Sequence, residues 1–285
     1  MASGLWTTQP AKTLLATVLI AASAGAICAT AEKPCDKPLY LTFDTGHMGI
    51  APLVAEVLNR QQVKVTFFGA QERTQEGDGS MGEHWAPWWK ARAAEGHAFA
   101  SHTYDHVYWK GDLPGNPPQF RVRPSAGPDT DKTFTWTAAQ YCEEIRHANQ
   151  RLQTMTGQAA LPLFRAPGGK TSPALLAAAK SCGYAHVGWA PAGFLGDELS
   201  SEKASNPALL AQALRTIRSG DILLAHLGIW SRKDPWAPAV LEPLIVGLKE
   251  RGFCFRTLRS GPGKGLVGIR PGGGPDAKLR RVARQ

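Results

Sequence analysis

Short runs of β-branched and aromatic residues alternate with stretches of helical periodicity along most of this 285-residue chain. Such alternation predicts β/α units arranged around a parallel sheet. We expect seven strands, at residues 39–43, 65–68, 98–101, 163–165, 186–189, 222–225 and 253–258. We expect helices at residues 52–60, 84–94, 138–156, 173–181, 207–218 and 239–251. The fold class is therefore α/β, and seven strands favour a closed or nearly closed barrel, because an open sheet would leave two edges to protect.

The first 31 residues read as a targeting segment. They contain one lysine, Lys12, then an apolar run and an A-x-A site that ends at Ala31, which together are typical of a secretory signal peptide. The run is shorter than the roughly 20 apolar residues that a membrane-spanning helix needs, and no later segment is long and apolar enough. We therefore expect an exported protein, periplasmic or secreted, with no stable membrane insertion.

The other end of the chain also falls outside the repeat. Residues 260–285 are rich in glycine and basic residues and poor in apolar ones, so we expect a disordered tail there and one catalytic domain over residues 32–259. The net charge of +9 favours anionic partners such as cell-wall polymers or membrane surfaces. Nucleic acid is not an expected partner, because the protein is exported and its basic residues are scattered outside the tail.

Unusual polar residues stand where the predicted strands end. Asp44 follows the first strand, His102 follows the third, Arg165 closes the fourth, and His226 follows the sixth. The carboxyl ends of barrel strands meet at one rim, where active sites of such folds are built from several strands. These four residues are therefore candidates for one site.

With their neighbours, these positions resemble the ordered motifs of the polysaccharide deacetylase (NodB-homology, carbohydrate esterase family 4-like) family. T-F-D-T-G contains Asp44, H-T-Y-D-H begins at His102, R-A-P-G-G begins at Arg165, and L-A-H ends at His226. The match spans about residues 39–258. It implies a distorted, TIM-barrel-like (β/α)7 barrel and a hydrolase that N-deacetylates amino sugars of a polysaccharide, either peptidoglycan or a chitin-like glycan.

The resemblance also implies a role for each of these side chains. Amide hydrolysis needs a nucleophilic water, stabilisation of the oxyanion and a proton for the leaving amine, and a divalent metal can serve the first two needs. His102 and His106 would bind that metal, which would be zinc, cobalt or another divalent ion. Asp44 would take the proton of the water and His226 would protonate the leaving nitrogen. Arg165 would keep Asp44 ionised and oriented.

Further residues are candidates for substrate contact. Leu224 would line the pocket for the acyl methyl group, Trp189 would flank that pocket, and two aromatic residues open the long Pro- and Gly-rich stretch 107–136, which we expect to be functional or disordered. The complete set of predicted substrate-contact residues is Thr45, Pro167, Gly168, Leu224, Trp189, Tyr108 and Trp109. By contrast, the helical spacing of Trp85, Trp88 and Trp89 favours packing in the core.

Two positions depart from the family pattern. Thr45 stands where the family has a second aspartate that binds the metal, so we expect weaker and more readily chelated metal. His47 could supply a third imidazole or could face the substrate from the rim. The family's fourth motif has an aspartate that orients the catalytic histidine, and Asp197 is our candidate for it, the alternative being a surface aspartate in a Gly-rich loop.

Four of the five cysteines, Cys35, Cys142, Cys182 and Cys254, follow the predicted leader, in a compartment that permits disulfides. Cys35 and Cys254 stand just before the first strand and at the start of the last, which are neighbours in a closed barrel, so a disulfide between them is geometrically possible. Free buried thiols are the alternative.

Two other functions remain possible at this stage. A deformylase or deacetylase of a lipid-linked sugar would use the same site and the basic tail to approach an anionic membrane. A non-catalytic carbohydrate-binding protein could also use this fold. The presence of Asp44, Arg165 and His226 argues against the second, because binding a glycan requires none of them.

Overall fold

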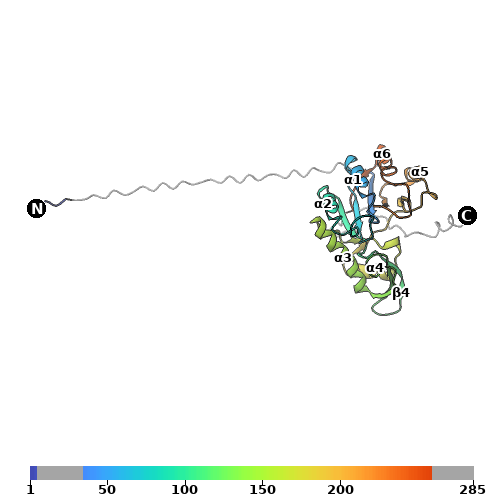
Figure 1. Cartoon of the computed structure of the whole chain (residues 1–285), viewed down its shortest axis with the longest axis horizontal. Coiled ribbons are helices and arrows are strands. Elements are labelled where there is room, and N and C mark those ends of the chain that lie inside the picture. Colours follow the sequence, from blue (N-terminus) through green and yellow to red (C-terminus); the bar gives the residue numbers. More distant parts are fainter. Residues whose placement is uncertain (5–34, 259–285) are drawn as a thin grey trace. The chain divides into compact units, whose positions relative to one another are not determined.

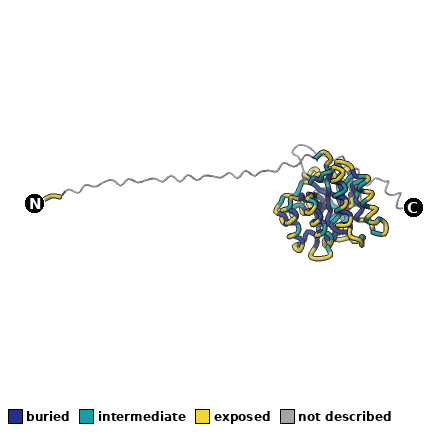
Figure 2. Tube along the Cα trace, turned by 90° about the horizontal axis from the view of Figure 1, so that it is seen from above, coloured by how far each residue is buried: buried dark blue, intermediate teal, exposed yellow. Residues whose placement is uncertain are grey.

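The computed structural model of the protein describes residues 1–4 and 35–258 (Figure 1). The predicted tail and nearly all of the predicted leader lie outside the described residues. Figure 2 shows buried residues in the interior of the folded part and exposed residues around them. The parallel strands are β1 (Pro38–Asp44), β2 (Thr66–Gly69), β3 (Ala98–Ser101), β7 (Leu163–Phe164), β8 (Ala185–His186), β9 (Ile222–His226) and β10 (Cys254–Phe255).

These seven strands form one sheet in the order β10-β1-β2-β3-β7-β8, and β9 also pairs with β1. The segment after β8 closes the ring, because the amide of Ala190 donates to the carbonyl of Ile222 (3.0 Å) and that of Leu195 donates to Leu224 (3.2 Å). Gly193 permits this approach, since a Cβ atom there would lie 2.0 Å from the Ile222 oxygen. The predicted distorted α/β barrel is confirmed.

The helices also agree with the sequence pattern, with every boundary within two residues of the prediction. They are α1 (Ala51–Arg60), α2 (Ala86–Ala94), α3 (Ala138–Thr156), α4 (Pro173–Ser181), α5 (Asn206–Thr216) and α6 (Leu241–Glu250), with 3-10 turns at Pro167–Gly169 and Pro191–Gly193. Helix α3 begins at a capping box of Thr137 and Gln140. As expected, Trp85 and Trp89 are in the core, and Trp88 packs against it.

The alternation of side chains along β1 explains how the barrel positions a polar site. Leu39, Leu41 and Phe43 are buried in the large cluster that also contains core residues of α1, α5 and α6. The residues between them point to the other face of the sheet. Thr42 and Asp44 therefore lie on the inner face, with Asp44 at the carboxyl end of the strand.

Residues 107–136, expected to be a functional or disordered loop, instead form a second sheet. Its antiparallel strands are β4 (Val107–Leu113), β5 (Gln119–Pro124) and β6 (Phe134–Thr137). Phe120 and Val122 are fully buried in a second cluster with residues of α3 and α4. The alternation Q-F-R-V-R-P in β5 was the signal for a half-buried strand, and the surrounding prolines and glycines obscured it.

Two disulfides are present among the described residues. Cys35 is bonded to Cys254, with 6.1 Å between their Cα atoms, which confirms the predicted pair. The second disulfide, Cys142 to Cys182, was not predicted as a pair and links α3 to the end of α4. None of the helices in the described ranges combines the length and apolar character needed to cross a bilayer.

Candidate active site

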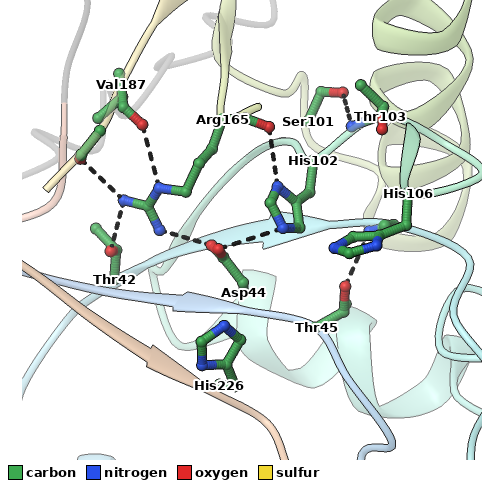
Figure 3. Close-up of polar contacts among 12 residues, drawn as sticks. Thr42, Asp44, Thr45, Ser101, His102, Thr103, His106, Arg165, Val187 and His226 are labelled. Atoms are coloured by element: carbon green, nitrogen blue, oxygen red, sulfur yellow. Dashed lines mark hydrogen bonds and ion pairs between the residues drawn. The ribbon is translucent and has the colours of Figure 1, made fainter. Parts of the chain in front are cut away.

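Asp44 and Arg165 form a buried ion pair at the centre of the barrel rim (Figure 3). Arg165 is fully buried and its Nη1 donates to Asp44 Oδ1 at 2.6 Å. Its other donors are also used, with Nη2 bonded to Thr42 Oγ1 (2.9 Å) and Nε bonded to the Val187 carbonyl (3.1 Å). This network fixes the orientation of the Asp44 carboxylate, and only the planar fork of an arginine matches all of these acceptors.

Electrostatics keep Asp44 ionised. Burial alone would raise the pKa of its carboxyl group, but the neighbouring cations, Arg165 first among them, outweigh burial and hold the pKa below its ordinary value of 3.8. Asp44 is 2 % exposed, so it is a desolvated carboxylate that remains charged at neutral pH.

His102 lies directly beside this carboxylate. Its Nδ1 is 2.9 Å from the carbonyl oxygen of Arg165, which can only accept, so Nδ1 carries a hydrogen and Nε2 is the ring nitrogen that can offer a lone pair. That Nε2 lies 3.3 Å from Asp44 Oδ2, which is also an acceptor. Nε2 and the carboxylate therefore share one buried space, in which a proton or a metal ion can lie between or beside them.

His106 presents its imidazole to the same place. Ser125 Oγ donates to the His106 carbonyl (3.1 Å), so it accepts the hydrogen of His106 Nδ1 (2.5 Å), which leaves the lone pair of Nε2 unused. The rings of His102 and His106 have centroids 4.8 Å apart, and burial lowers the pKa of His106 to about 4, so that ring is neutral at neutral pH. Two adjacent imidazoles, each with Nδ1 bonded to an acceptor so that Nε2 is the nitrogen left for a ligand, fit a divalent metal.

The third family ligand is replaced by a threonine that is occupied elsewhere. Thr45 is fully buried, and its hydroxyl oxygen accepts a hydrogen bond from the amide of Ala70 (3.1 Å). No surface of Thr45 is accessible in this structure, and its contact with substrate stays a prediction. Within residues 1–4 and 35–258, no three His, Cys, Asp or Glu side chains form a metal-binding group.

His226 faces Asp44 from the adjacent strand, since the two residues are register partners in the β1–β9 pair. Asp197, the candidate partner, accepts from the His226 backbone amide (2.6 Å) and lies 3.2 Å from Nδ1 of its ring. Burial would lower the pKa of His226, but the carboxylates of Asp197, Asp44 and Glu198 outweigh burial and raise the pKa to about 9. His226 is therefore an imidazolium at neutral pH.

The loops that follow β1 and β9 are joined to each other. The amide of His47 donates to the carbonyl of Gly228 (3.0 Å), and the amide of Leu227 donates to that of Asp44 (3.0 Å). Gly46 has φ +117°, and a Cβ atom on it would lie 2.1 Å from the Gly228 oxygen, so only glycine fits in this part of T-F-D-T-G. His47 packs against Gly228 on the side of this junction, and the structure does not group it with His102 and His106.

The other predicted substrate-contact residues differ in how close they lie to the site. Tyr108 lies beside His106 (ring centroids 5.0 Å apart) and in contact with Gly168, while Trp189 packs against Gly169. Trp109 points to the opposite face of β4 and packs, partly buried, against the second core cluster, so its stacking on sugar stays a prediction that this packing does not favour. The other two predicted residues, Pro167 and Leu224, are buried at the rim and in β9.

Sequence reasoning missed two polar participants. Thr42 bonds Arg165, and its position two residues before Asp44 on the same strand face was the available signal. Glu198 contributes to the charge around His226, and burial raises the pKa of Glu198 itself. Glu198 belongs to no motif, and the only sequence signal for it was that it follows Asp197.

A buried carboxylate held by an arginine, a pair of adjacent imidazoles and an imidazolium on a barrel rim define a site for hydrolysis with acid and base assistance. The chain belongs to the polysaccharide deacetylase family, whose model matches residues 31–187. Membership places the chain among hydrolases that act on amide bonds of N-acetyl sugars, so the predicted family and enzyme class are confirmed.

Two relatives with named activities are similar to this chain. The chain is 27 % identical over 224 residues to the peptidoglycan-N-acetylmuramic acid deacetylase PdaA of Bacillus subtilis, covering 78 % of this chain and 70 % of the relative. It is 26 % identical over 230 residues to a chitooligosaccharide deacetylase of Azorhizobium caulinodans, covering 77 % of this chain and 92 % of the relative.

Solved structures with the same fold include a family 4 acetyl xylan esterase from Clostridium thermocellum in complex with a cobalt ion. The TM-score is 0.56 at 22 % identity, over 78 % of this chain and 88 % of that one. A family 4 pseudoenzyme from Bacillus anthracis also matches, with a TM-score of 0.56 at 17 % identity over 78 % of this chain and 63 % of that one. Because this fold supports pseudoenzymes as well as esterases, activity must be argued from the site residues.

Proposed function

We propose that this protein is an exported, metal-assisted hydrolase that N-deacetylates amino sugars of a polysaccharide, either peptidoglycan or a chitin-like glycan. The observation that carries the proposal is the pair of opposite protonation states on adjacent strands. Asp44 is an ionised carboxylate and His226 is an imidazolium, and both face one point of the rim. A base and an acid that are ready at the same pH are what amide hydrolysis needs.

Asp44 acts as the general base. Arg165 occupies its Oδ1, so Oδ2, on the side of His102, is the oxygen free to take a proton from water. The same bonds from Arg165 keep the carboxylate oriented as its charge changes. Desolvation keeps bulk water from competing for that proton.

His226 acts as the general acid. Asp197 receives the Nδ1 hydrogen of the ring, which directs Nε2 toward the reacting group and leaves its proton available to the leaving nitrogen. The pKa of about 9 keeps that proton on the ring at neutral pH.

A divalent metal would be held by His102 and His106 through their Nε2 atoms, and it would supply Lewis-acid activation of water and of the acyl oxygen. Zinc suits two imidazoles, and cobalt can replace it. Thr45 contributes no charge, so the metal would be held by fewer anionic ligands than the family pattern provides. We therefore expect it to be lost readily to a chelator.

Tyr108 and Trp189 form the walls on which the amino sugar rests. Tyr108 stands next to His106, and its ring limits the space above Gly168. Leu224, next but one before His226 in β9, is buried on this strand and would line the pocket for the acyl methyl. Sugar rings carry faces of C–H groups that pack against such aromatic side chains.

A second candidate function, a glycan-binding protein without catalysis, is favoured by one observation, the replacement of a metal-binding carboxylate by Thr45. The test is acetate release by the purified protein from peptidoglycan fragments and from chitooligosaccharides, with zinc, with cobalt and with a chelator. Metal-dependent acetate release supports the proposed enzyme. Glycan binding with no release under any of these conditions would overturn it in favour of the second candidate.

A further inference from the structure

Trp230 is unusually exposed for an indole side chain. It is 55 % exposed, and among the described residues only Met1 is a more exposed large hydrophobic residue. Trp230 follows His226 by four residues, in the loop after β9 that forms part of the active-site rim. An aromatic side chain that protein atoms leave open at the edge of a site is available to a ligand.

Two side chains from other rim loops contact the indole. The ring of His47, from the loop after β1, lies with its centroid 4.9 Å from that of Trp230 and is tilted by 60°. The guanidinium of Arg73, from the loop after β2, lies 4.7 Å from the indole centroid. Because His47 is three residues from Asp44, these contacts place Trp230 on the rim that carries the proposed base and acid.

The loop that carries Trp230 is anchored on both sides. Before it, Gly228 accepts the His47 amide hydrogen bond. After it, Ser231 Oγ donates to the Glu198 carbonyl (3.0 Å) and Arg232 Nη1 donates to that of Leu199 (2.8 Å). The indole is therefore held in place before a ligand arrives, so binding costs little ordering of the chain.

Arg73 brings a positive charge to the same place. It is exposed, and within residues 1–4 and 35–258 no carboxylate lies within ion-pair distance of its guanidinium. Its planar group presents parallel N–H donors that match a carboxylate in a bidentate arrangement. An unpaired guanidinium beside an open indole is complementary to a ring with an apolar face and an anionic substituent.

We propose that Trp230 and Arg73 form a subsite for a sugar unit that carries a carboxylate, adjacent to the amino sugar that is deacetylated. The inference rests on the proposed function and deepens it, because it selects an acidic glycan over a neutral one as substrate. The C–H face of the sugar packs on the exposed part of the indole, and the carboxylate of that sugar binds the guanidinium.

The first test measures binding without turnover. An Asp44→Asn protein is titrated calorimetrically with a tetrasaccharide of alternating N-acetylglucosamine and N-acetylmuramic acid, and with the same glycan after reduction of its carboxylates to alcohols. Adding Trp230→Ala is expected to raise the dissociation constant of both glycans by about tenfold, as for the loss of one aromatic contact. Equal affinity with and without the indole would overturn the subsite.

The second test isolates the charge. The protein with Arg73 is expected to bind the carboxylate glycan about tenfold more tightly than the reduced glycan. Arg73→Gln is expected to remove this preference, and Arg73→Lys is expected to restore part of it. Lys90→Gln on α2 removes one exposed positive charge elsewhere and controls for net charge. A preference that persists in Arg73→Gln, or that Lys90→Gln abolishes equally, would refute a role for Arg73.

These outcomes are separable from failure of the proposed function. In the catalytically intact background, hydrolysis of a small acetate ester reports the reaction centre alone, and Trp230→Ala is expected to raise KM for the tetrasaccharide by more than KM for the ester. If no protein releases acetate but the binding differences are present, the deacetylase proposal fails and the subsite stands. If acetate is released and the binding differences are absent, the subsite fails alone.

Discussion

Replacing Asp197 by asparagine tests the origin of the charge on His226. Asp197 is the strongest of the influences that raise the pKa of His226 from its ordinary 6.5 to about 9, and it contacts both the backbone amide and the ring. An opposite charge at such contact distance shifts a pKa by about 1–3 units, so Asp197→Asn should lower the pKa of His226 by about that amount. Each unit corresponds to about 1.4 kcal/mol.

The assay is the pH dependence of kcat/KM for acetate release. If His226 donates a proton, wild-type activity falls as pH rises through about 9, and the alkaline limb of the variant should lie about 1–3 pH units lower. Asp234→Asn, an exposed aspartate in the loop after Trp230, is the matched control and should leave the limb in place. An alkaline limb that does not move in Asp197→Asn would refute the assignment of His226 as a charged acid held by Asp197.

Stability should follow the same titration. The folded-state pKa of His226 lies above 6.5, so the stabilisation by its ion pair is full below about pH 6.5 and is lost as pH rises through about 9. The shift corresponds to about 3 kcal/mol of unfolding free energy. Denaturant unfolding at pH 6 and at pH 10 should show this difference in the wild type and much less of it in Asp197→Asn. Equal pH dependence in both proteins would contradict the linkage.

Three further perturbations test the remaining features. Arg165→Lys keeps a charge but loses most of the hydrogen bonds of the buried fork, so it should lower the free energy of unfolding by about 3 kcal/mol in denaturant titrations, and wild-type stability would count against the network. Thr45→Asp should bind zinc more tightly in a competition with a chelator, and an unchanged affinity would show that His102 and His106 are not part of a metal site. Replacing both Cys35 and Cys254 by serine should lower thermal stability by about 2–5 kcal/mol, and an unchanged unfolding midpoint would show that the link is dispensable.

The order of the barrel was predictable because each β/α unit carries its own periodic signal. The alternation that buries Leu39, Leu41 and Phe43 also turns Asp44 inward, so residues at strand ends could be assigned to one rim. The disulfide between Cys35 and Cys254 followed from the same topology, since a closed barrel makes the first and last strands neighbours.

Contacts that depend on loop conformation were less predictable. Asp197 reaches His226 through a Gly-rich segment with no periodicity, so the sequence only offered it as a candidate. The faces of β4 could be assigned only once the strand was known, and for this reason Tyr108 and Trp109 were treated alike although they point in opposite directions. Trp230 carried no motif at all, because its exposure and its neighbours are properties of the folded rim.

The most direct test of the proposed chemistry is acetate release by Asp44→Asn, measured on an N-acetylated glycan with metal present. The amide keeps the size of the carboxylate but cannot accept the proton of the attacking water, so kcat should fall by about 10²–10⁴-fold while the protein stays folded and still binds zinc. Asp234→Asn should release acetate at the wild-type rate. Turnover near that of the wild type in folded, zinc-loaded Asp44→Asn would contradict the account, because the base would then lie elsewhere.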